Sequence, residues 1–131
     1  MDSSVINDML DSGQLQALGN ATIEPFLAGD GLAVLFFAGT GGRHNEAHDV
    51  AVALREIIRD YHGSLRAGIV NAEEEAALQS RFRVQRSPSL ALVHEGVTLE
   101  VIPGVRDWAD YARALQRYLG NPPPPGAGET A

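Results

Sequence analysis

Two histidines four residues apart are the side chains that most resemble a chemical site in this sequence. His44 and His48 flank Glu46, and two imidazoles at this spacing can share a metal ion when they lie on one helix face. The zinc-protease pattern places its glutamate directly after the first histidine, whereas Glu46 comes one position later. We therefore expect a solvated helix end without a metal. Metal-assisted hydrolysis stays open as an alternative that the metal content would test.

The sequence has no cysteine, so the protein cannot carry out disulfide exchange. That reaction requires a thiolate that attacks a disulfide sulfur. The glycine-rich segment 39–42 lacks the lysine and the following serine or threonine of a phosphate-binding P-loop. With neither pattern present, we predict a protein that is not an enzyme and that uses no cofactor.

The composition of the 131 residues indicates an ordinary globular domain. Hydrophobic residues make up 44% and charged residues 21%, and the net charge is −7. Binding to nucleic acid usually needs a concentrated basic surface, so we do not expect it. No apolar run approaches the roughly 20 residues that span a bilayer, and the N-terminus lacks the pattern of an export signal. We therefore expect a cytoplasmic protein that does not insert into the membrane.

The pattern of apolar residues predicts alternating strands and helices. The run 32–38 is apolar on both faces, which indicates a central strand that is covered on two sides. The other predicted strands are 15–18, 65–70, 89–94 and 97–102, and the predicted helices are 3–11, 22–27, 46–61, 71–82 and 107–119. This order favours an α/β fold with helices on both faces of a mixed sheet. We expect one domain over residues 1–120 that begins with an N-terminal helical extension, and a flexible proline- and glycine-rich tail over 121–131.

Three polar residues and one acidic run are expected at the N-terminal ends of helices. Thr22, Asn71 and Asp107 precede predicted helices and are typical N-cap residues. The acidic run 73–75 falls in the first turn of a helix, where negative charge is favourable, so we interpret it as a solvated helix start. The aromatic residues Phe36, Phe37, Trp108 and Tyr111 are predicted to pack in or near the core.

The segment from about residue 15 to residue 119 resembles a thioredoxin that lacks sulfur. Arg86-Ser87-Pro88 leads into the strand 89–94, where thioredoxins place a cis-proline, and Gly104 parallels the glycine that lines their substrate groove. The segment 39–44 stands where the Cys-x-x-Cys motif would be. Leu35 stands where active thioredoxins carry a buried carboxylate. The resemblance implies a thioredoxin-like three-layer α/β/α fold with a mixed parallel and antiparallel sheet, and a lost redox activity.

Among cysteine-free thioredoxin-like proteins, the sequence is most similar to the hydrogenase accessory family called HyaE or HupG. The passages 81–84 and 104–108 and the long loop 39–46 carry this similarity. It implies a cytoplasmic chaperone that binds the precursor small subunit of a [NiFe] hydrogenase through its twin-arginine signal, with other maturation proteins as further partners. The alternative is a redox-inactive adaptor that docks in another complex or dimerises. The oligomeric state stays open.

The resemblance also implies a client-binding cleft around Pro88. In thioredoxin-like proteins the backbone before the cis-proline pairs with an extended client segment, and Ser87 would present these groups. The predicted client-binding residues are Arg43, Arg86, Ser87, Pro88, Gly104 and Arg106. The simpler interpretation is a proline that only shapes a turn and arginines that are only solvated.

Charge raises a difficulty for this cleft. A rim that contains Arg86 and Arg106 favours an acidic peptide and disfavours a twin-arginine segment. An acidic surface such as 73–75, or the apolar stretch of the signal, would then have to make the contact.

Overall fold

A mixed five-stranded sheet forms the centre of the computed structural model, which describes residues 4–39 and 44–121. The strands are β1 (Gln16–Leu18), β2 (Leu32–Phe37), β3 (Leu65–Val70), β4 (Ser89–His94) and β5 (Val97–Pro103). Their spatial order is β1-β3-β2-β4-β5. The pairs β1–β3 and β2–β3 are parallel, whereas β2–β4 and β4–β5 are antiparallel.

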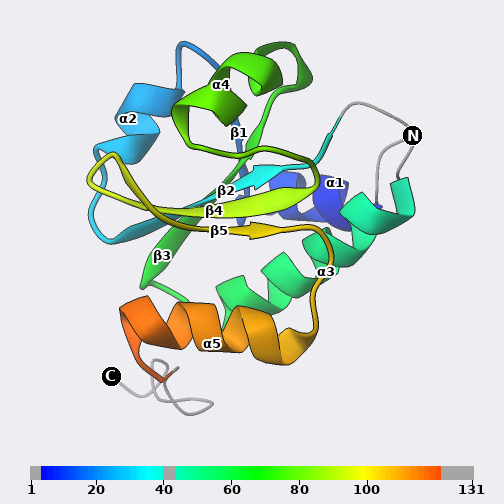
Figure 1. Ribbon diagram of the computed structural model, residues 1–131, viewed down its shortest axis with the longest axis vertical. Coiled ribbons are helices and arrows are strands. Elements are labelled where there is room, and N and C mark those ends of the chain that lie inside the picture. Colours follow the sequence, from blue (N-terminus) through cyan, green and yellow to red (C-terminus); the bar gives the residue numbers. More distant parts are fainter. Residues whose placement is uncertain (1–3, 40–43, 122–131) are drawn as a thin grey trace.

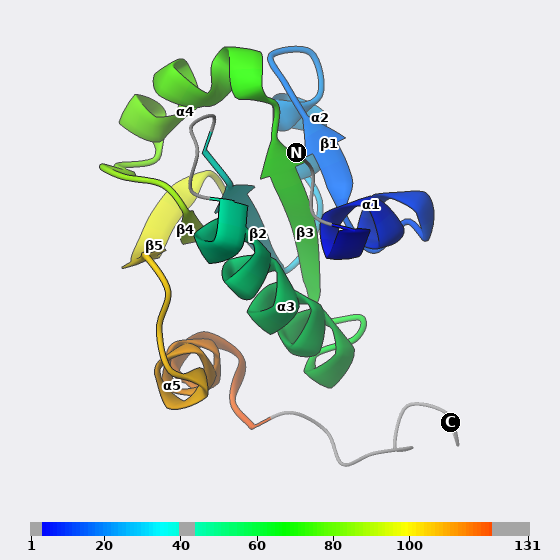
Figure 2. The same ribbon diagram turned by 90° about the vertical axis from the view of Figure 1, so that its right-hand side faces the viewer.

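Helices cover both faces of this sheet (Figures 1 and 2). They are α1 (Ser4–Asp11), α2 (Ile23–Leu27), α3 (His44–Asp60), the short 3₁₀ helix η1 (Ala72–Glu74), α4 (Glu75–Arg81) and α5 (Trp108–Leu119). One face packs against α1, α3 and α5, and the other packs against α2 and α4. All six residues of β2 are buried because side chains of a strand alternate between its two covered faces. Phe36 lies in the first core and Phe37 in the second.

The predicted order of strands and helices is confirmed, with small shifts at the boundaries. Helix α3 begins at His44, two residues before the predicted start, and β2 ends at Phe37. The predicted N-cap residues occupy the cap positions of α2, η1 and α5, but none makes a side-chain cap hydrogen bond. The Thr22 hydroxyl instead accepts a hydrogen bond from the Gly19 N–H at 2.8 Å and thereby closes the turn before α2. Within the described ranges, the helices are too short or too polar to form a transmembrane span.

The aromatic predictions hold for three residues and are wrong for Trp108. Phe36, Phe37 and Tyr111 are buried. Trp108 is 44% exposed, although it shares a helical stripe with Tyr111 and Leu115. Helical spacing predicts which side of a helix a residue occupies, but it does not predict where along the helix the packing ends. Trp108 is the first residue of α5, and the packed part of the helix begins at Tyr111.

Candidate functional site

The loop before β4 holds the predicted cleft residues close together. The Ser87–Pro88 peptide bond is cis, as predicted, and Pro88 is buried. The hydroxyl of Ser89, which is fully buried, donates a hydrogen bond to the Arg86 carbonyl at 2.6 Å. The Pro88 carbonyl accepts a hydrogen bond from the Gly104 N–H at 2.8 Å. The loop is therefore tied both to its own strand and to the end of β5.

Gly104 lies directly against the side chain of Arg86. A Cβ atom at position 104 would stand 3.0 Å from Nη2 and 3.5 Å from Cζ of Arg86. The backbone at Gly104 also has a φ of +72°, which favours glycine. Four of the predicted residues, Arg86, Ser87, Pro88 and Gly104, are thus neighbours in the structure.

The end of β2 approaches the same loop through Gly39. A Cβ atom at this position would lie 2.9 Å from Oγ of Ser87 and 3.3 Å from its Cβ, so only glycine fits without a shift. Its φ of +94° again favours glycine. The segment 39–44, which the sequence resemblance aligns with the thioredoxin Cys-x-x-Cys motif, contains Arg43. Arg43 lies outside the described residues, so its predicted role stays a prediction.

Arg106 lies on the connection after Gly104, and its guanidinium points toward the end of β5. Its Nε donates a hydrogen bond to the Pro103 carbonyl at 2.9 Å, and its side chain is exposed. The Arg106 N–H and the Gly104 carbonyl both lie within 3.4 Å of the Tyr111 hydroxyl, which accepts from the first and donates to the second. Burial raises the pKa of Tyr111 above its ordinary value, so the hydroxyl keeps its proton. Arg106 is therefore next to the cleft, and its guanidinium is held at Pro103.

Glu75 is the residue of the acidic run whose burial the sequence analysis misjudged. The run 73–75 was interpreted as solvated, but Glu75 is only 6% exposed. Its Oε2 accepts a hydrogen bond from the Gly39 N–H at 3.1 Å, and Gln79 donates one to its Oε1 at 3.4 Å. Burial raises the pKa of Glu75, and the Gly39 N–H lowers it in part. The available signal was its helical spacing with Leu78, which places both on the buried face.

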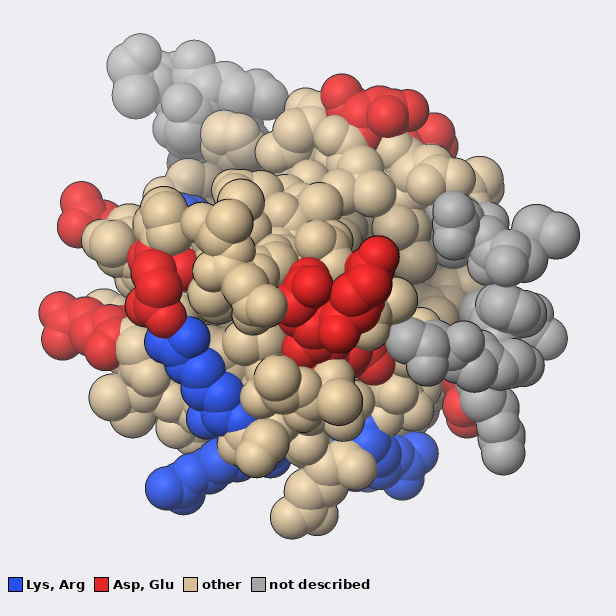
Figure 3. Space-filling model, turned by 90° about the horizontal axis from the view of Figure 1, so that it is seen from above, with Lys and Arg blue, Asp and Glu red and all other residues tan. Residues whose placement is uncertain are grey.

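The other two residues of the acidic run are accessible, as predicted. Glu73 is exposed and Glu74 is partly exposed. Figure 3 shows the molecule from the side of α2 and α4, and acidic side chains gather in the middle of this view while basic side chains lie along one border. The net negative charge is therefore unevenly distributed, with exposed carboxylates one and two residues before the buried Glu75.

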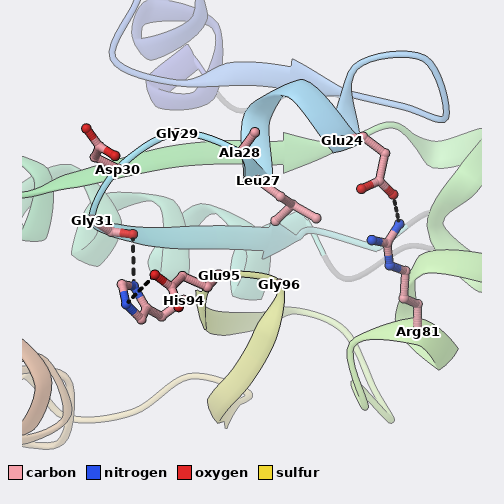
Figure 4. A pocket seen from close by; sticks show the side chains of 10 residues that line it. All are labelled: Glu24, Leu27, Ala28, Gly29, Asp30, Gly31, Arg81, His94, Glu95 and Gly96. Atoms are coloured by element: carbon pink, nitrogen blue, oxygen red, sulfur yellow. Dashed lines mark hydrogen bonds and ion pairs between the residues drawn. The ribbon is translucent and has the colours of Figure 1, made fainter.

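A pocket of about 540 Å³ lies at the opposite end of β2 and β4 (Figure 4). Four of its lining side chains contact one another in pairs, because Arg81 lies 2.5 Å from Glu24 and His94 lies 3.8 Å from Glu95. The hydrogen bond from Arg81 lowers the pKa of Glu24. No residue of the predicted cleft lines this pocket.

The metal alternative at His44 and His48 stays a prediction, because it includes a side chain outside the described residues. Over residues 4–39 and 44–121, no group of three histidine, aspartate or glutamate side chains could hold a metal ion. His48 is partly buried, and the side chain of His44 lies outside the described residues.

Comparison with solved structures identifies the fold. The chain matches a thioredoxin variant from Halobacterium salinarum with a TM-score of 0.66 and 16% identity, over 84% of this chain and 95% of that one. It also matches the crystal structure of the hydrogenase expression/formation protein HupG from Rhodopseudomonas palustris with a TM-score of 0.57 and 40% identity, over 79% and 94% of the two chains. The fold is therefore thioredoxin-like.

Comparison of sequences identifies the family. The hydrogenase expression/formation protein HoxO of Cupriavidus necator is 38% identical over 128 residues, which cover 95% of this chain and 80% of the relative. The corresponding protein HupG of Bradyrhizobium diazoefficiens is 38% identical over 112 residues, which cover 82% of this chain and 76% of the relative. Residues 5–111 match the family described as hydrogenase-1 expression protein HyaE. The chain, a thioredoxin fold without thiols, is a member of the HyaE family.

Proposed function

We propose that this protein is a non-enzymatic assembly chaperone in the maturation of a [NiFe] hydrogenase. In this role it binds the precursor of the small subunit, acts in the cytoplasm before export, and recognises the twin-arginine signal. Other maturation proteins are further partners. The observation that carries the proposal is membership of the HyaE family over residues 5–111.

The residues around Pro88 support a binding role. The chain has no thiol, the Gly104 N–H bonds to the Pro88 carbonyl, and Gly39 and Gly104 lie against the side chains of Ser87 and Arg86. An extended peptide can pair with backbone groups at such a site, because main-chain hydrogen bonds supply affinity and side-chain contacts supply specificity. In the proposed complex Ser87 presents the backbone groups, with Arg86 beside them.

Arg86 and Arg106 would repel the twin-arginine signal, so its two arginines need an acidic partner elsewhere on the surface. Glu73 and Glu74 precede Glu75, whose carboxylate bonds to Gly39 at the edge of the cleft. We assign the contact with the client arginine pair to the exposed Glu73, because the Glu74 carboxylate lies against Gly19. Arg86 lies on the other side of Ser87, against Gly104, so the two signs of charge meet different parts of the client.

Co-purification with hydrogenase precursors tests the proposal. The small-subunit precursor is expressed with its export signal, without the signal, and with the arginine pair replaced by glutamine. We expect capture of the intact precursor and a clear loss with either altered form. Equal capture of all three forms would show that the signal is not the recognised part, and no capture of any form would contradict the chaperone role.

Variants of the cleft locate the binding site. Arg86→Glu and Ser87→Glu are expected to weaken capture while the helical circular dichroism spectrum stays unchanged. Arg59→Glu is the matched control, because Arg59 is an exposed arginine that pairs with Glu56 on α3. If Arg59→Glu weakens capture as much as Arg86→Glu, the effect comes from net charge and not from the cleft.

A further inference from the structure

Two arginines between α4 and β4 have no partner in the described part of the chain. Arg83 and Arg86 are exposed, and neither forms an ion pair or a side-chain hydrogen bond with residues 4–39 or 44–121. Four other arginines do pair with carboxylates, namely Arg59, Arg81, Arg113 and Arg117. The segment 76–94 contains three arginines and no aspartate or glutamate, although the chain has 17 acidic residues. These two guanidinium groups are therefore available to an external carboxylate.

Arg83 occupies a backbone position that usually belongs to glycine. It follows Phe82, the C-cap residue of α4, and its φ is +64°. The Val84 N–H bonds to the Gln79 carbonyl at 2.8 Å, and the Arg83 N–H bonds to the Ser80 carbonyl at 3.4 Å. This pair of hydrogen bonds is the Schellman motif, whose left-handed residue is most often glycine because a Cβ atom is strained there. The helix end alone would thus favour glycine over arginine at position 83.

The other left-handed positions show the same preference. Nine residues of the described ranges have a positive φ, and seven of them are glycines; the exceptions are Arg83 and Glu95. The Glu95 carboxylate lies 3.8 Å from Nε2 of His94, whereas the Arg83 guanidinium has no such contact within the described chain. A positive charge near the C-terminus of a helix is favourable, and this is the internal benefit that Arg83 has. A strained backbone with so little internal compensation is typical of a residue that serves an external partner.

The residues after Arg83 offer further hydrogen-bond donors. In the part of the chain that the structure describes, the N–H groups of Gln85, Arg86 and Ser87 have no acceptor. The Arg86 carbonyl is already bonded to the Ser89 hydroxyl at 2.6 Å. Guanidinium and backbone N–H groups donate hydrogen bonds and accept none. The segment 83–87 therefore suits a ligand that is rich in acceptors and negatively charged.

The acidic side chains around this segment leave its charge uncompensated. Glu75 is buried, and Glu24 pairs with Arg81. Asp107 is exposed, but it forms an ion pair with neither arginine of the segment. It directly follows Arg106, whose positive charge offsets it. The segment 83–87 therefore keeps an excess of positive charge on a chain whose net charge is −7.

We propose that Arg83 and Arg86 bind an extended acidic segment of a partner protein. Guanidinium groups bind carboxylates through two parallel hydrogen bonds. The two arginines are three residues apart, so their Cα atoms lie at most about 11 Å from each other. An extended peptide with carboxylates on alternate residues presents them about 7 Å apart on one side, so one peptide reaches both arginines. A nucleic acid fits less well, because the net charge of −7 opposes a continuous phosphate backbone.

Two short synthetic peptides are the probes for this site. One alternates glutamate with threonine, and the other alternates glutamine with threonine, so they differ in charge and hardly in shape. Binding to the full chain is followed by the fluorescence anisotropy of a dye at the peptide N-terminus. We expect the wild type to bind the glutamate peptide at least about tenfold more tightly than the glutamine peptide in about 0.1 M salt. Most of this preference should be lost in about 1 M salt, where charges are screened.

Three variants test the role of the two arginines. Arg83→Gly removes one guanidinium and introduces the residue that suits the left-handed backbone. It should weaken the glutamate peptide about fivefold, leave the glutamine peptide unchanged, and keep the midpoint of urea unfolding at or above that of the wild type. Arg86→Gln should weaken the glutamate peptide to a similar extent. Arg113→Gln is the matched control, because it removes an exposed arginine that pairs with Asp110 on α5, and it should change neither affinity.

Several outcomes would overturn this inference. Equal binding of both peptides by the wild type, or an equal loss with Arg113→Gln, would mean that the two arginines are only solvated. A lower urea midpoint for Arg83→Gly would mean that the arginine is kept for the helix end. If inorganic polyphosphate displaces the labelled glutamate peptide at a lower concentration than the unlabelled peptide does, the site binds phosphate and the proposed occupant is wrong. No hydrogenase precursor takes part in these measurements, so the inference and the proposed function can each fail without the other.

Discussion

The two ends of the central strands are built in opposite ways. At the end that carries the cis-proline, backbone groups and small residues approach one another closely, and the polar side chains of Ser89 and Glu75 are buried. At the hairpin end, a pocket of about 540 Å³ is lined by exposed charged groups such as Glu24 and Arg81, which form an ion pair. The end with the larger pocket is therefore not the end where the sequence is more constrained. Substitutions are more restricted at the cis-proline end, because the residues there leave no room for larger side chains.

The largest effect is expected from Gly39→Ala at the crowded end. The added Cβ would meet Ser87 at 2.9 Å, and the positive φ adds strain. Gly13→Ala is the matched control, because Gly13 has a φ of +82° but nothing within 4 Å of its Cβ position. We expect a loss of about 1–2 kcal/mol at Gly13 from the left-handed backbone alone. Gly39→Ala should lose roughly 1–3 kcal/mol more, as overpacking does. Urea unfolding measures both, and equal losses would mean that Ser87 yields freely.

Ser89→Ala should have the next largest effect. The Ser89 hydroxyl is fully buried and holds the Arg86 carbonyl at 2.6 Å, so its loss removes one tie of the cleft loop. We expect a loss of about 1 kcal/mol in the free energy of unfolding, together with weaker capture of the client. Ser12→Ala is the control, because the Ser12 hydroxyl bonds to a backbone carbonyl outside the cleft. If Ser12→Ala weakens capture as much as Ser89→Ala does, capture does not depend on the order of the loop before β4.

Glu75→Gln tests the buried carboxylate through pH. Burial raises the pKa of Glu75 in the folded protein, so its protonated form is favoured there. Relative to the glutamine variant, the wild type should be most stable below the ordinary glutamate pKa. It should lose this relative stability as pH rises to the raised value and then level off. Urea unfolding from pH 4 to pH 8 measures the difference, with Glu73→Gln as the control for losing one exposed carboxylate. A difference that is constant with pH contradicts the shift.

The smallest effect is expected at the hairpin end. Glu24→Gln removes the partner of Arg81, but both side chains are largely exposed. The lowered pKa of Glu24 means that the pair contributes above the ordinary glutamate pKa and less as pH falls. Solvent and salt screen such pairs, so the melting temperature should hardly change at either low or high salt. If Glu24→Gln lowers the melting temperature as much as Ser89→Ala does, and the effect depends on salt, the two ends do not differ in the way described.

The sequence predicted the fold and the cis-proline turn because these rest on local patterns. The strand 32–38 and the turn at Ser87-Pro88 can be recognised from the local composition and spacing of residues. Glu75 and Trp108 were misjudged because their environments depend on where an element stops against the rest of the fold. Glu75 is buried by Gly39, which lies 36 residues away in the chain. Trp108 is exposed because the packed part of α5 begins one turn later.

The hydrogen bond that closes the end of α5 has a practical consequence. The Tyr61 hydroxyl donates to the Gly120 carbonyl at 2.8 Å and fixes the point at which the chain leaves the last helix. That point lies on the far side of the molecule from the start of α5, where the connection from Gly104 arrives (Figure 1). If the client binds around Pro88 as proposed, an affinity handle or a fluorophore fused to the C-terminus should leave that binding intact. Protein immobilised through this end is therefore the form to use in the proposed capture experiment.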